Sequence, residues 1–172
     1  MDTSKMRHYE ESDLIDAPAE KVFECVDDHK RLAGHMGESS WMMGGGRMGV
    51  KVDAGNGQKV GSHISMAGKV WGIDLFLDEV VTEYQPPNKK VWETVGPIRL
   101  VVIGHYRMGI AVADEDGESR LKVFIDYELP SGGTRWLGYL LGGMYAKWCV
   151  RQMLRGTVDY FADKKEGRVE SE

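Results

Sequence analysis

The order of strand-like and helix-like segments constrains the fold of this chain more than any other feature. A first strand, His8–Asp16, leads at once into a helix that Pro18 opens, because the missing N–H of proline costs nothing in a first turn. Asp16 is the expected N-cap of that helix. Strand-like sequence then runs from Met48 to Leu129, and one long helix, Thr134 to Lys164, closes the chain. This order predicts an α+β fold in which a curved sheet surrounds a long helix and leaves a hollow between them.

Six further strand-like segments follow a second short helix at about Asp28 to Ala33. Turn-forming residues such as Ala67-Gly68 and Gly96-Pro97 separate these segments. No helix lies between them, so we expect antiparallel pairing. The segments are Met48–Asp53, Val60–Ala67, Val70–Glu83, Lys90–Val95, Leu100–Ala113 and Arg120–Leu129.

Length and composition indicate one domain, residues 8–164, with flexible ends at 1–7 and 165–172. The formal net charge of −5 argues against a nucleic-acid partner, which needs a basic face. The N-terminus has no apolar signal sequence, and no run reaches the roughly 18 apolar residues of a membrane span, so a cytoplasmic location is expected. Cys25 and Cys149 are far apart in apolar helical sequence and are expected to be buried thiols.

Three parts of the chain resemble the SRPBCC superfamily, also called the START or Bet v 1-like superfamily, and in particular its polyketide cyclase/dehydrase and lipid transport members. They are the stretch IDAPAEKVFECVDDHKRL after the first strand, the strand–turn–strand VVTEYQPPNKKVWET, and the long terminal helix. The resemblance covers roughly residues 8 to 163. It implies a helix-grip fold, in which a curved seven-stranded antiparallel sheet wraps around the C-terminal helix and two short helices close one end. It implies no single activity, since lipid carriers, quinone-binding proteins, cyclases and oxygenases share this fold.

Strand alternation predicts which side chains face the hollow. The even positions of Leu100–Ala113 and the odd positions of Arg120–Leu129 are the more apolar sets, which leaves His105 and Arg107 on the outer face. Trp92 lies on a strand whose pattern is ambiguous. A stripe of the terminal helix faces the same hollow. The predicted ligand-binding residues of the sheet and helix are Ser62, Ile64, Met66, Trp71, Ile73, Leu75, Trp92, Tyr106, Met108, Ile110, Val123, Ile125, Tyr127, Leu137, Leu141 and Met144.

The connection from His35 to Met48 is rich in methionine and glycine, which suits a flexible gate at the mouth of a hydrophobic site. Met36 and Trp41 complete the predicted ligand-binding set. A copper(I) site formed by these methionines and His35 is the less favoured interpretation. The five histidines show no metal-binding spacing, so we expect no metal and no cofactor.

Three functional hypotheses follow. The favoured one is a non-enzymatic binder or transporter of a hydrophobic small molecule such as a lipid, quinone or polyketide. The second is a polyketide cyclase or dehydratase-like enzyme that uses His105, Arg107, Tyr106 or Tyr127, and a register shift of one residue would turn the first two inward. The third is a membrane- or protein-interaction module that uses the apolar segment Trp136–Trp148 and nearby cations. The pattern leaves the oligomeric state open.

Overall fold

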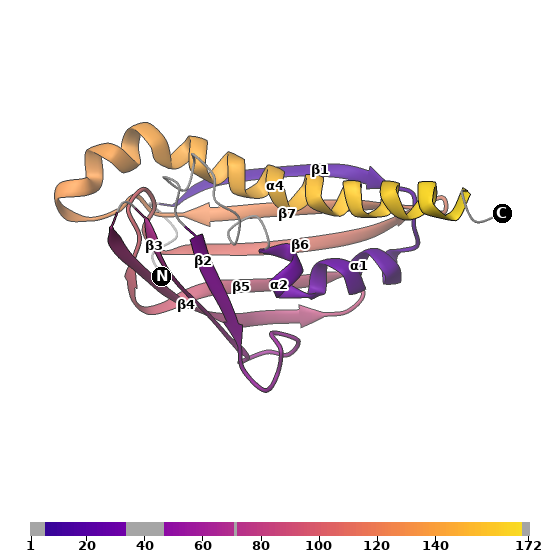
Figure 1. The fold of residues 1–172 in the computed structure, drawn as a ribbon, viewed down its shortest axis with the longest axis horizontal. Helices are drawn as coiled ribbons and strands as arrows, with labels where there is room; N and C mark the ends of the chain where they lie inside the picture. Colours follow the sequence, from indigo (N-terminus) through magenta and orange to yellow (C-terminus); the bar gives the residue numbers. More distant parts are fainter. Residues whose placement is uncertain (1–5, 34–46, 71, 170–172) are drawn as a thin grey trace.

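The computed structural model describes residues 6–33, 47–70 and 72–169. Seven strands form one antiparallel sheet in the order β1-β7-β6-β5-β4-β3-β2. Two short helices, α1 and α2, follow β1, and α4 closes the chain after a short 3-10 turn, η3 (Figure 1). The helix-grip architecture expected from the sequence is therefore confirmed. The elements are β1 Arg7–Ile15, α1 Ala19–Asp27, α2 His29–Leu32, β2 Arg47–Val52, β3 His63–Val70, β4 Ile73–Gln85, β5 Lys89–Arg99, β6 Tyr106–Glu115, β7 Glu118–Tyr127, η3 Gly132–Thr134 and α4 Arg135–Val169.

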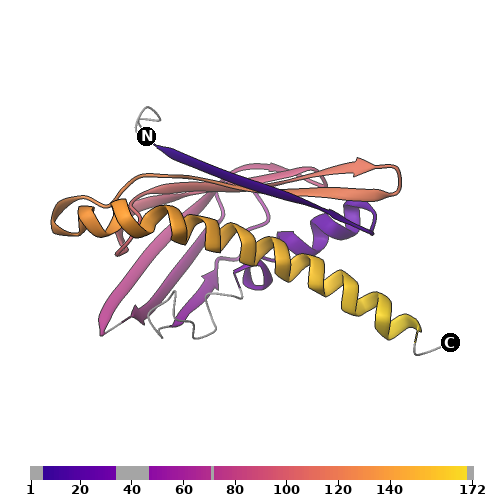
Figure 2. The same cartoon turned by 90° about the horizontal axis from the view of Figure 1, so that it is seen from above.

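The helices α1, α2 and α4 lie on the same side of the sheet. Figure 2 shows α4 crossing beneath β1 and β7, while α1 and α2 lie against its C-terminal half. The strands β2, β3 and β4 bend toward the helices at the far edge of the sheet. The first strand pairs with the last, with Arg7 opposite Tyr127 and Ile15 opposite Ser119. This arrangement puts the hydrophobic core between the sheet and α4.

Alternation along β6 and β7 places their side chains as predicted. Tyr106, Met108, Ile110 and Val112 are buried on β6, and β7 buries its odd positions from Leu121 to Tyr127. Intervening positions such as Arg107 are more exposed. The predicted register is therefore confirmed on these two strands.

Two predicted breaks between strands were wrong, and so was the predicted start of β6. Ala67-Gly68 lies inside β3, which continues to Val70 and pairs with β4. The Gly96-Pro97 break lies inside β5, where a step of two residues from Phe76 to Asp78 on β4 is matched by a step of four on β5. Gly96 has a φ of 64°, a conformation that favours glycine. Pro97 is tolerated because β5 pairs with β6 only from Lys89 to Glu93, so the missing N–H interrupts no bond there. β6 begins at Tyr106 rather than at the predicted Leu100.

The helix ends also differ from expectation. Pro18, not Asp16, is the N-cap of α1, and no side chain in the described part of the chain caps it. Asp16 instead forms an ion pair with Lys165 of α4. α4 continues to Val169, five residues beyond the predicted end at Lys164, so residues 165–169 are helical. Asp28 caps α2 by accepting bonds from the backbone N–H groups of Lys30 and Arg31.

The first turns of α4 pack closely on the segment before β6. A Cβ atom at Gly142 would lie 2.8 Å from the carbonyl oxygen of Val102, and one at Gly138 would lie 2.2 Å from Cδ of Pro130. Only glycine fits at these two positions, which explains their presence in a helix despite their low helix propensity. Within the described residues, no helix is both long and apolar enough to cross a membrane.

Candidate functional site

A small chamber lies between the sheet, α2 and α4. A water-sized sphere has about 20 Å³ of room inside it, which is enough for about one water molecule. The wall is mostly apolar and aromatic, and its polar side chains come from the sheet (Glu79 and Tyr106), from α2 (His29) and from α4 (Tyr145 and Cys149). The lining residues are His29, Met66, Leu77, Glu79, Trp92, Leu100, Ile103, Tyr106, Met108, Ile125, Tyr145, Cys149 and Met153.

His29, Glu79 and Tyr106 meet inside this chamber. The hydroxyl of Tyr106 donates a hydrogen bond to Oε1 of Glu79. Nε2 of His29 lies 3.3 Å from Oε2 of the same carboxyl group, and both side chains are almost fully buried. The orientation of these two atoms does not make a hydrogen bond, so both nitrogens of His29 and Oε2 of Glu79 lack a partner among the described residues. The edge of the imidazole ring meets Trp92, with 5.0 Å between ring centroids.

The electrostatics of the chamber keep its proton donors protonated. Burial first, and the neighbouring Glu79 second, raise the pKa of the Tyr106 hydroxyl well above its ordinary value. Burial raises the pKa of the Cys149 thiol to about 12. Tyr106 therefore acts as a hydrogen-bond donor at neutral pH, and Cys149 is a neutral thiol rather than a nucleophile.

The sequence contains one indication of this site that the prediction of ligand-binding residues did not include, namely Glu79. Glu79 lies two and four residues after Leu77 and Leu75 on β4, so it faces the same side of the sheet. Strand alternation predicts that this side points inward. An acidic residue on an apolar face is the kind of exception that marks a site. His29 carried no such signal, because only the fold brings the first turn of α2 against β4.

The structure brings together a subset of the predicted ligand-binding residues. Met66, Trp92, Tyr106, Met108 and Ile125 line the chamber. A second group is buried in the core on the same face without lining it: Ile64, Leu75, Ile110, Val123 and Tyr127.

The remaining predicted residues are placed elsewhere. Ser62 is buried in a turn, where its hydroxyl donates to Asp53 and accepts from the N–H of Gly57, so it does not line the chamber. Ile73 and Met144 are 40% and 46% exposed, because β4 begins and α4 turns outward at these points. Leu137 and Leu141 are half-buried. Met36, Trp41 and Trp71 lie outside the described residues.

Of the four residues predicted for an enzymatic role, only Tyr106 lines the chamber, since Tyr127 is buried in the core beside it and the other two lie elsewhere. Arg107 lies on the outer face of the sheet, 3.6 Å from Asp126 and over the ring of Phe124. His105 precedes β6, and its Nδ1 lies 2.9 Å from the hydroxyl of Thr94. Tyr106 points inward, as alternation requires. The described residues contain no group of three histidine, cysteine or acidic side chains that could hold a metal ion.

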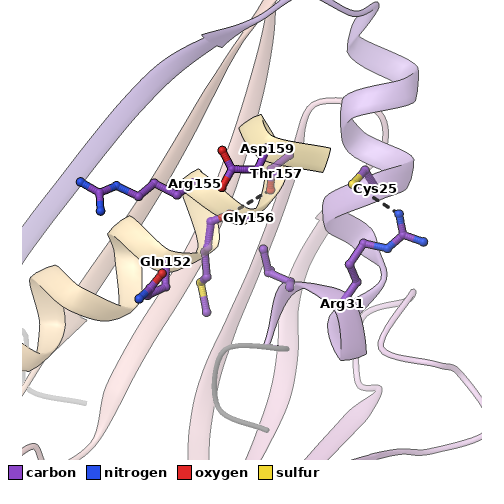
Figure 3. A pocket seen from close by; sticks show the side chains of 9 residues that line it. Cys25, Arg31, Gln152, Arg155, Gly156, Thr157 and Asp159 are labelled. Atoms are coloured by element: carbon purple, nitrogen blue, oxygen red, sulfur yellow. Dashed lines mark hydrogen bonds between the residues drawn. The ribbon is translucent and has the colours of Figure 1, made fainter. Parts of the chain in front are cut away.

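Two hollows flank the chamber on either side of α2. The larger, about 550 Å³, lies between α1, α2 and α4, and Met153 lines both it and the chamber (Figure 3). The smaller, about 320 Å³, includes Asn56 and Gln58, and His29 lines both it and the chamber. Arg31 and Arg155 project from opposite sides of the larger hollow and do not form an anion clamp (Figure 3). Met153 thus lies at the boundary between the chamber and a hollow large enough for a small molecule.

A second buried polar cluster lies beside the chamber, at the end of α1. Nζ of Lys90 donates to Oδ1 and to the backbone oxygen of Asp27, at 2.9 and 3.0 Å. Oδ2 of Asp27 accepts from the Tyr84 hydroxyl at 2.7 Å and from the Gln58 amide at 3.2 Å. Burial lowers the pKa of Lys90, and the carboxylate of Asp27 opposes that shift.

A curved antiparallel sheet that grips one long helix over an apolar chamber defines a hydrophobic-ligand-binding fold. Residues 6–164 match the family described as polyketide cyclase / dehydrase and lipid transport, and the chain belongs to this family. A comparison with curated protein sequences finds no match.

Solved structures show the same fold at low sequence identity. The Zhui aromatase/cyclase from a Streptomyces species is 14% identical with a TM-score of 0.69, over 91% of this chain and 94% of that one. A protein of Thermus thermophilus, TTHA0849, is 16% identical with a TM-score of 0.67, over 92% and 99%. A norcoclaurine synthase from Thalictrum flavum is 10% identical with a TM-score of 0.64, over 93% and 96%. The chain is therefore of the SRPBCC, or Bet v 1-like, type.

Proposed function

We propose that this protein binds a hydrophobic small molecule that carries a hydrogen-bonding group, in the space between the sheet and α4. The observation that carries the proposal is that three polar atoms, on His29 and Glu79, have no hydrogen bond among the described residues, in a chamber whose wall is mostly apolar. A buried polar atom without a partner costs about 1–3 kcal/mol, so it is retained where it serves a purpose. A hydroxyl or carbonyl group on a ligand would satisfy these atoms.

The volume of the chamber sets a condition on the ligand. Small-molecule sites usually occupy roughly 300–1,000 Å³, far more than the chamber alone provides. If the side chain of Met153 rotates, the chamber joins the adjacent hollow of about 550 Å³. Methionine suits this movement because it is unbranched and has three rotatable bonds. We therefore place a hydrogen-bonding group of the ligand at His29 and Glu79 inside the chamber, and the rest of the ligand across Met153 toward the hollow, whose wall carries polar side chains such as Gln152 and Thr157. A lipid, a quinone or a polyketide with polar groups at both ends fits this placement.

A second function, cyclase- or dehydratase-type chemistry, is favoured by one specific observation. A carboxyl group, an imidazole and a phenol converge where bulk water does not enter. Glu79 or His29 would then remove a proton from a carbon next to a carbonyl, and Tyr106 would donate a hydrogen bond to the carbonyl oxygen. In this interpretation His105 and Arg107 have no catalytic role.

Native mass spectrometry of the purified protein, with extraction and identification of any bound molecule, tests the binding proposal. We expect a co-purifying apolar ligand, or binding from a panel of lipids, quinones and polyketides. Glu79→Gln and His29→Phe should weaken binding by roughly tenfold or more, since each removes a charged or polar contact. His63→Asn is the matched control, because His63 is exposed and pairs with Asp78 on the outer face. A protein that stays empty with the whole panel would overturn the proposal.

Turnover separates the two functions. The bound molecule is incubated with the wild-type protein and with Glu79→Gln, and the products are analysed by mass spectrometry. An unchanged molecule identifies a binder or carrier, whereas a loss of water or a new ring that depends on Glu79 identifies an enzyme.

A further inference from the structure

An exposed apolar patch lies on the first turns of α4, away from the chamber. It consists of Trp136, Tyr139, Leu140 and Met144, which are 63%, 67%, 67% and 46% exposed. Only eight large hydrophobic residues are exposed in the described part of the chain, and half of them belong to this patch. We call these four residues the α4 patch.

The packing of α4 is the reverse of an ordinary amphipathic helix in this region. Gly138 and Gly142 face the protein and contact Pro130 and the carbonyl of Val102, while Trp136 and Leu140 face solvent. Surface helices usually bury the large apolar side chains and expose the small or polar ones. Folding of this domain alone therefore gives no reason for the large side chains on the outer side of α4.

Charge around the α4 patch is strongly one-sided. Residues 129–158 contain no aspartate or glutamate but four cations, Arg135, Lys147, Arg151 and Arg155, in a chain whose net charge is −5. Arg151 is paired with Glu11 of β1 at 3.0 Å, so the cations next to the patch are Arg135 and Lys147. Arg135 and Lys147 bracket the patch along the helix and are both exposed. The guanidinium of Arg7 lies over the ring of Tyr139, 5.0 Å from its centroid. The patch is thus an apolar and aromatic surface with a cationic border.

We propose that the α4 patch docks this protein on the surface of an anionic lipid bilayer. Tryptophan and tyrosine favour the interface between water and acyl chains, and bordering lysines and arginines attract anionic head groups. The patch lies at one end of the molecule, whereas α1 and α2 flank the opposite half of α4 (Figures 1 and 2). Docking by this end leaves the hollow beside Met153 uncovered.

The same charges argue against a second copy of the chain as the occupant. In a two-fold dimer the patch would meet itself, so Arg135 and Lys147 would face identical cations. Like charges across an interface disfavour association. An anionic surface matches both the apolar centre and the cationic border.

Vesicle flotation tests the proposal with the full chain. We expect binding to phosphatidylcholine vesicles that contain about 30% phosphatidylglycerol, little binding to pure phosphatidylcholine, and release at high salt. Trp136→Ser with Leu140→Ser should reduce binding by roughly tenfold or more. Arg135→Gln with Lys147→Gln should weaken binding to the anionic vesicles only. Phe76→Ser is the matched control, because Phe76 is also exposed but lies on the sheet.

Two results would overturn the proposal. One is a wild-type protein that does not float with anionic vesicles, or that floats equally well when Trp136 and Leu140 are both serine. The other is a concentration-dependent dimer in analytical ultracentrifugation that the serine variant abolishes, which would identify a second copy as the occupant. Circular dichroism of each variant confirms that a loss of binding does not reflect unfolding.

Discussion

The two buried polar clusters beside α2 differ in how completely their hydrogen bonds are satisfied. In the first, the Asp27 carboxylate accepts from Lys90, Tyr84 and Gln58, so both of its oxygens are used. In the second, Glu79 accepts from Tyr106, while its other oxygen and both nitrogens of His29 have no partner in the described part of the chain. The clusters are neighbours, because Asp27 and His29 are separated by one residue.

This difference separates a structural role from a functional one. A buried hydrogen-bond network in which every polar group has a partner rigidifies the fold. A buried network with unpaired polar groups lowers the stability of the folded protein. The Asp27 cluster ties the end of α1 to β4, β5 and the turn before β3. The His29 cluster has acceptor and donor capacity that the described residues do not use. The predictions below test this assignment.

The largest effect on stability is expected from breaking the Asp27 cluster. Lys90→Met leaves the Asp27 carboxylate buried without its cation, and the free energy of unfolding should fall by about 3–5 kcal/mol. Urea denaturation measures it. The matched control is Lys89→Met, since Lys89 is partly exposed and pairs with Glu83, and it should cost at most about 1 kcal/mol. Asp27→Asn combined with Lys90→Met should recover most of the loss, and a single variant as stable as the control would contradict the structural role.

The wall of the chamber should show the next largest effect. Met153→Ala removes a buried side chain and should lower the free energy of unfolding by about 2–4 kcal/mol. It should also join the chamber to the adjacent hollow and increase the binding of an apolar fluorescent dye. Met144→Ala on the same helix is the control, because Met144 is exposed and its loss should change stability by no more than about 0.5 kcal/mol. Unchanged dye binding in Met153→Ala would show that Met153 does not separate the two spaces.

A pH-dependent effect distinguishes the role of Tyr84. Tyr84→Phe should lower the free energy of unfolding by about 1.5–2 kcal/mol at neutral pH, because the hydroxyl donates to a carboxylate. Burial and the bond to Asp27 raise the pKa of Tyr84 from 10.0 to about 12. Between these values the folded protein keeps a proton that the unfolded chain loses, so this contribution is complete below pH 10 and disappears as the pH rises through about 12. The difference between wild type and Tyr84→Phe in urea denaturation should shrink over that range, and a constant difference would contradict the assignment.

The smallest effect on stability is expected in the His29 cluster. Glu79→Gln keeps an acceptor for the Tyr106 hydroxyl and removes a buried acidic group, so the free energy of unfolding should change by less than about 1 kcal/mol. Ligand binding should nevertheless fall. If urea denaturation instead shows a loss like that of Lys90→Met, then His29 and Glu79 form a structural ion pair and the contrast between the clusters disappears.

The sequence predicted the fold class well because periodicity is a local property. The inward residues of β6 and β7 alternate cleanly, and the placement of Arg107 on the outer face followed from it. The β5 strand was ambiguous because its buried face carries Lys90, Trp92 and Thr94, which is not an apolar pattern. The partners that bury Lys90 are distant in sequence, so no local pattern could reveal that face.

The site was only half predictable for the same reason. Glu79 and Leu77 are two residues apart on β4 and face the same side, so strand alternation predicts an inward carboxyl group. His29 lies 50 residues before Glu79 and on another element. Its role depends on their contact in the folded protein, which no local sequence pattern predicts. Ser62, placed inward by parity, is instead a turn residue bound to Asp53.

By itself the sequence determined an antiparallel sheet, a long closing helix and an apolar interior, since hydrophobic periodicity and turn residues act over a few positions. Only the tertiary structure decided which polar side chains meet inside, how little space they share, and which face of α4 is exposed. Those outcomes depend on distances between residues far apart in the chain, such as His29 and Glu79, or Gly142 and Val102. Packing sets these distances, and no local pattern encodes them.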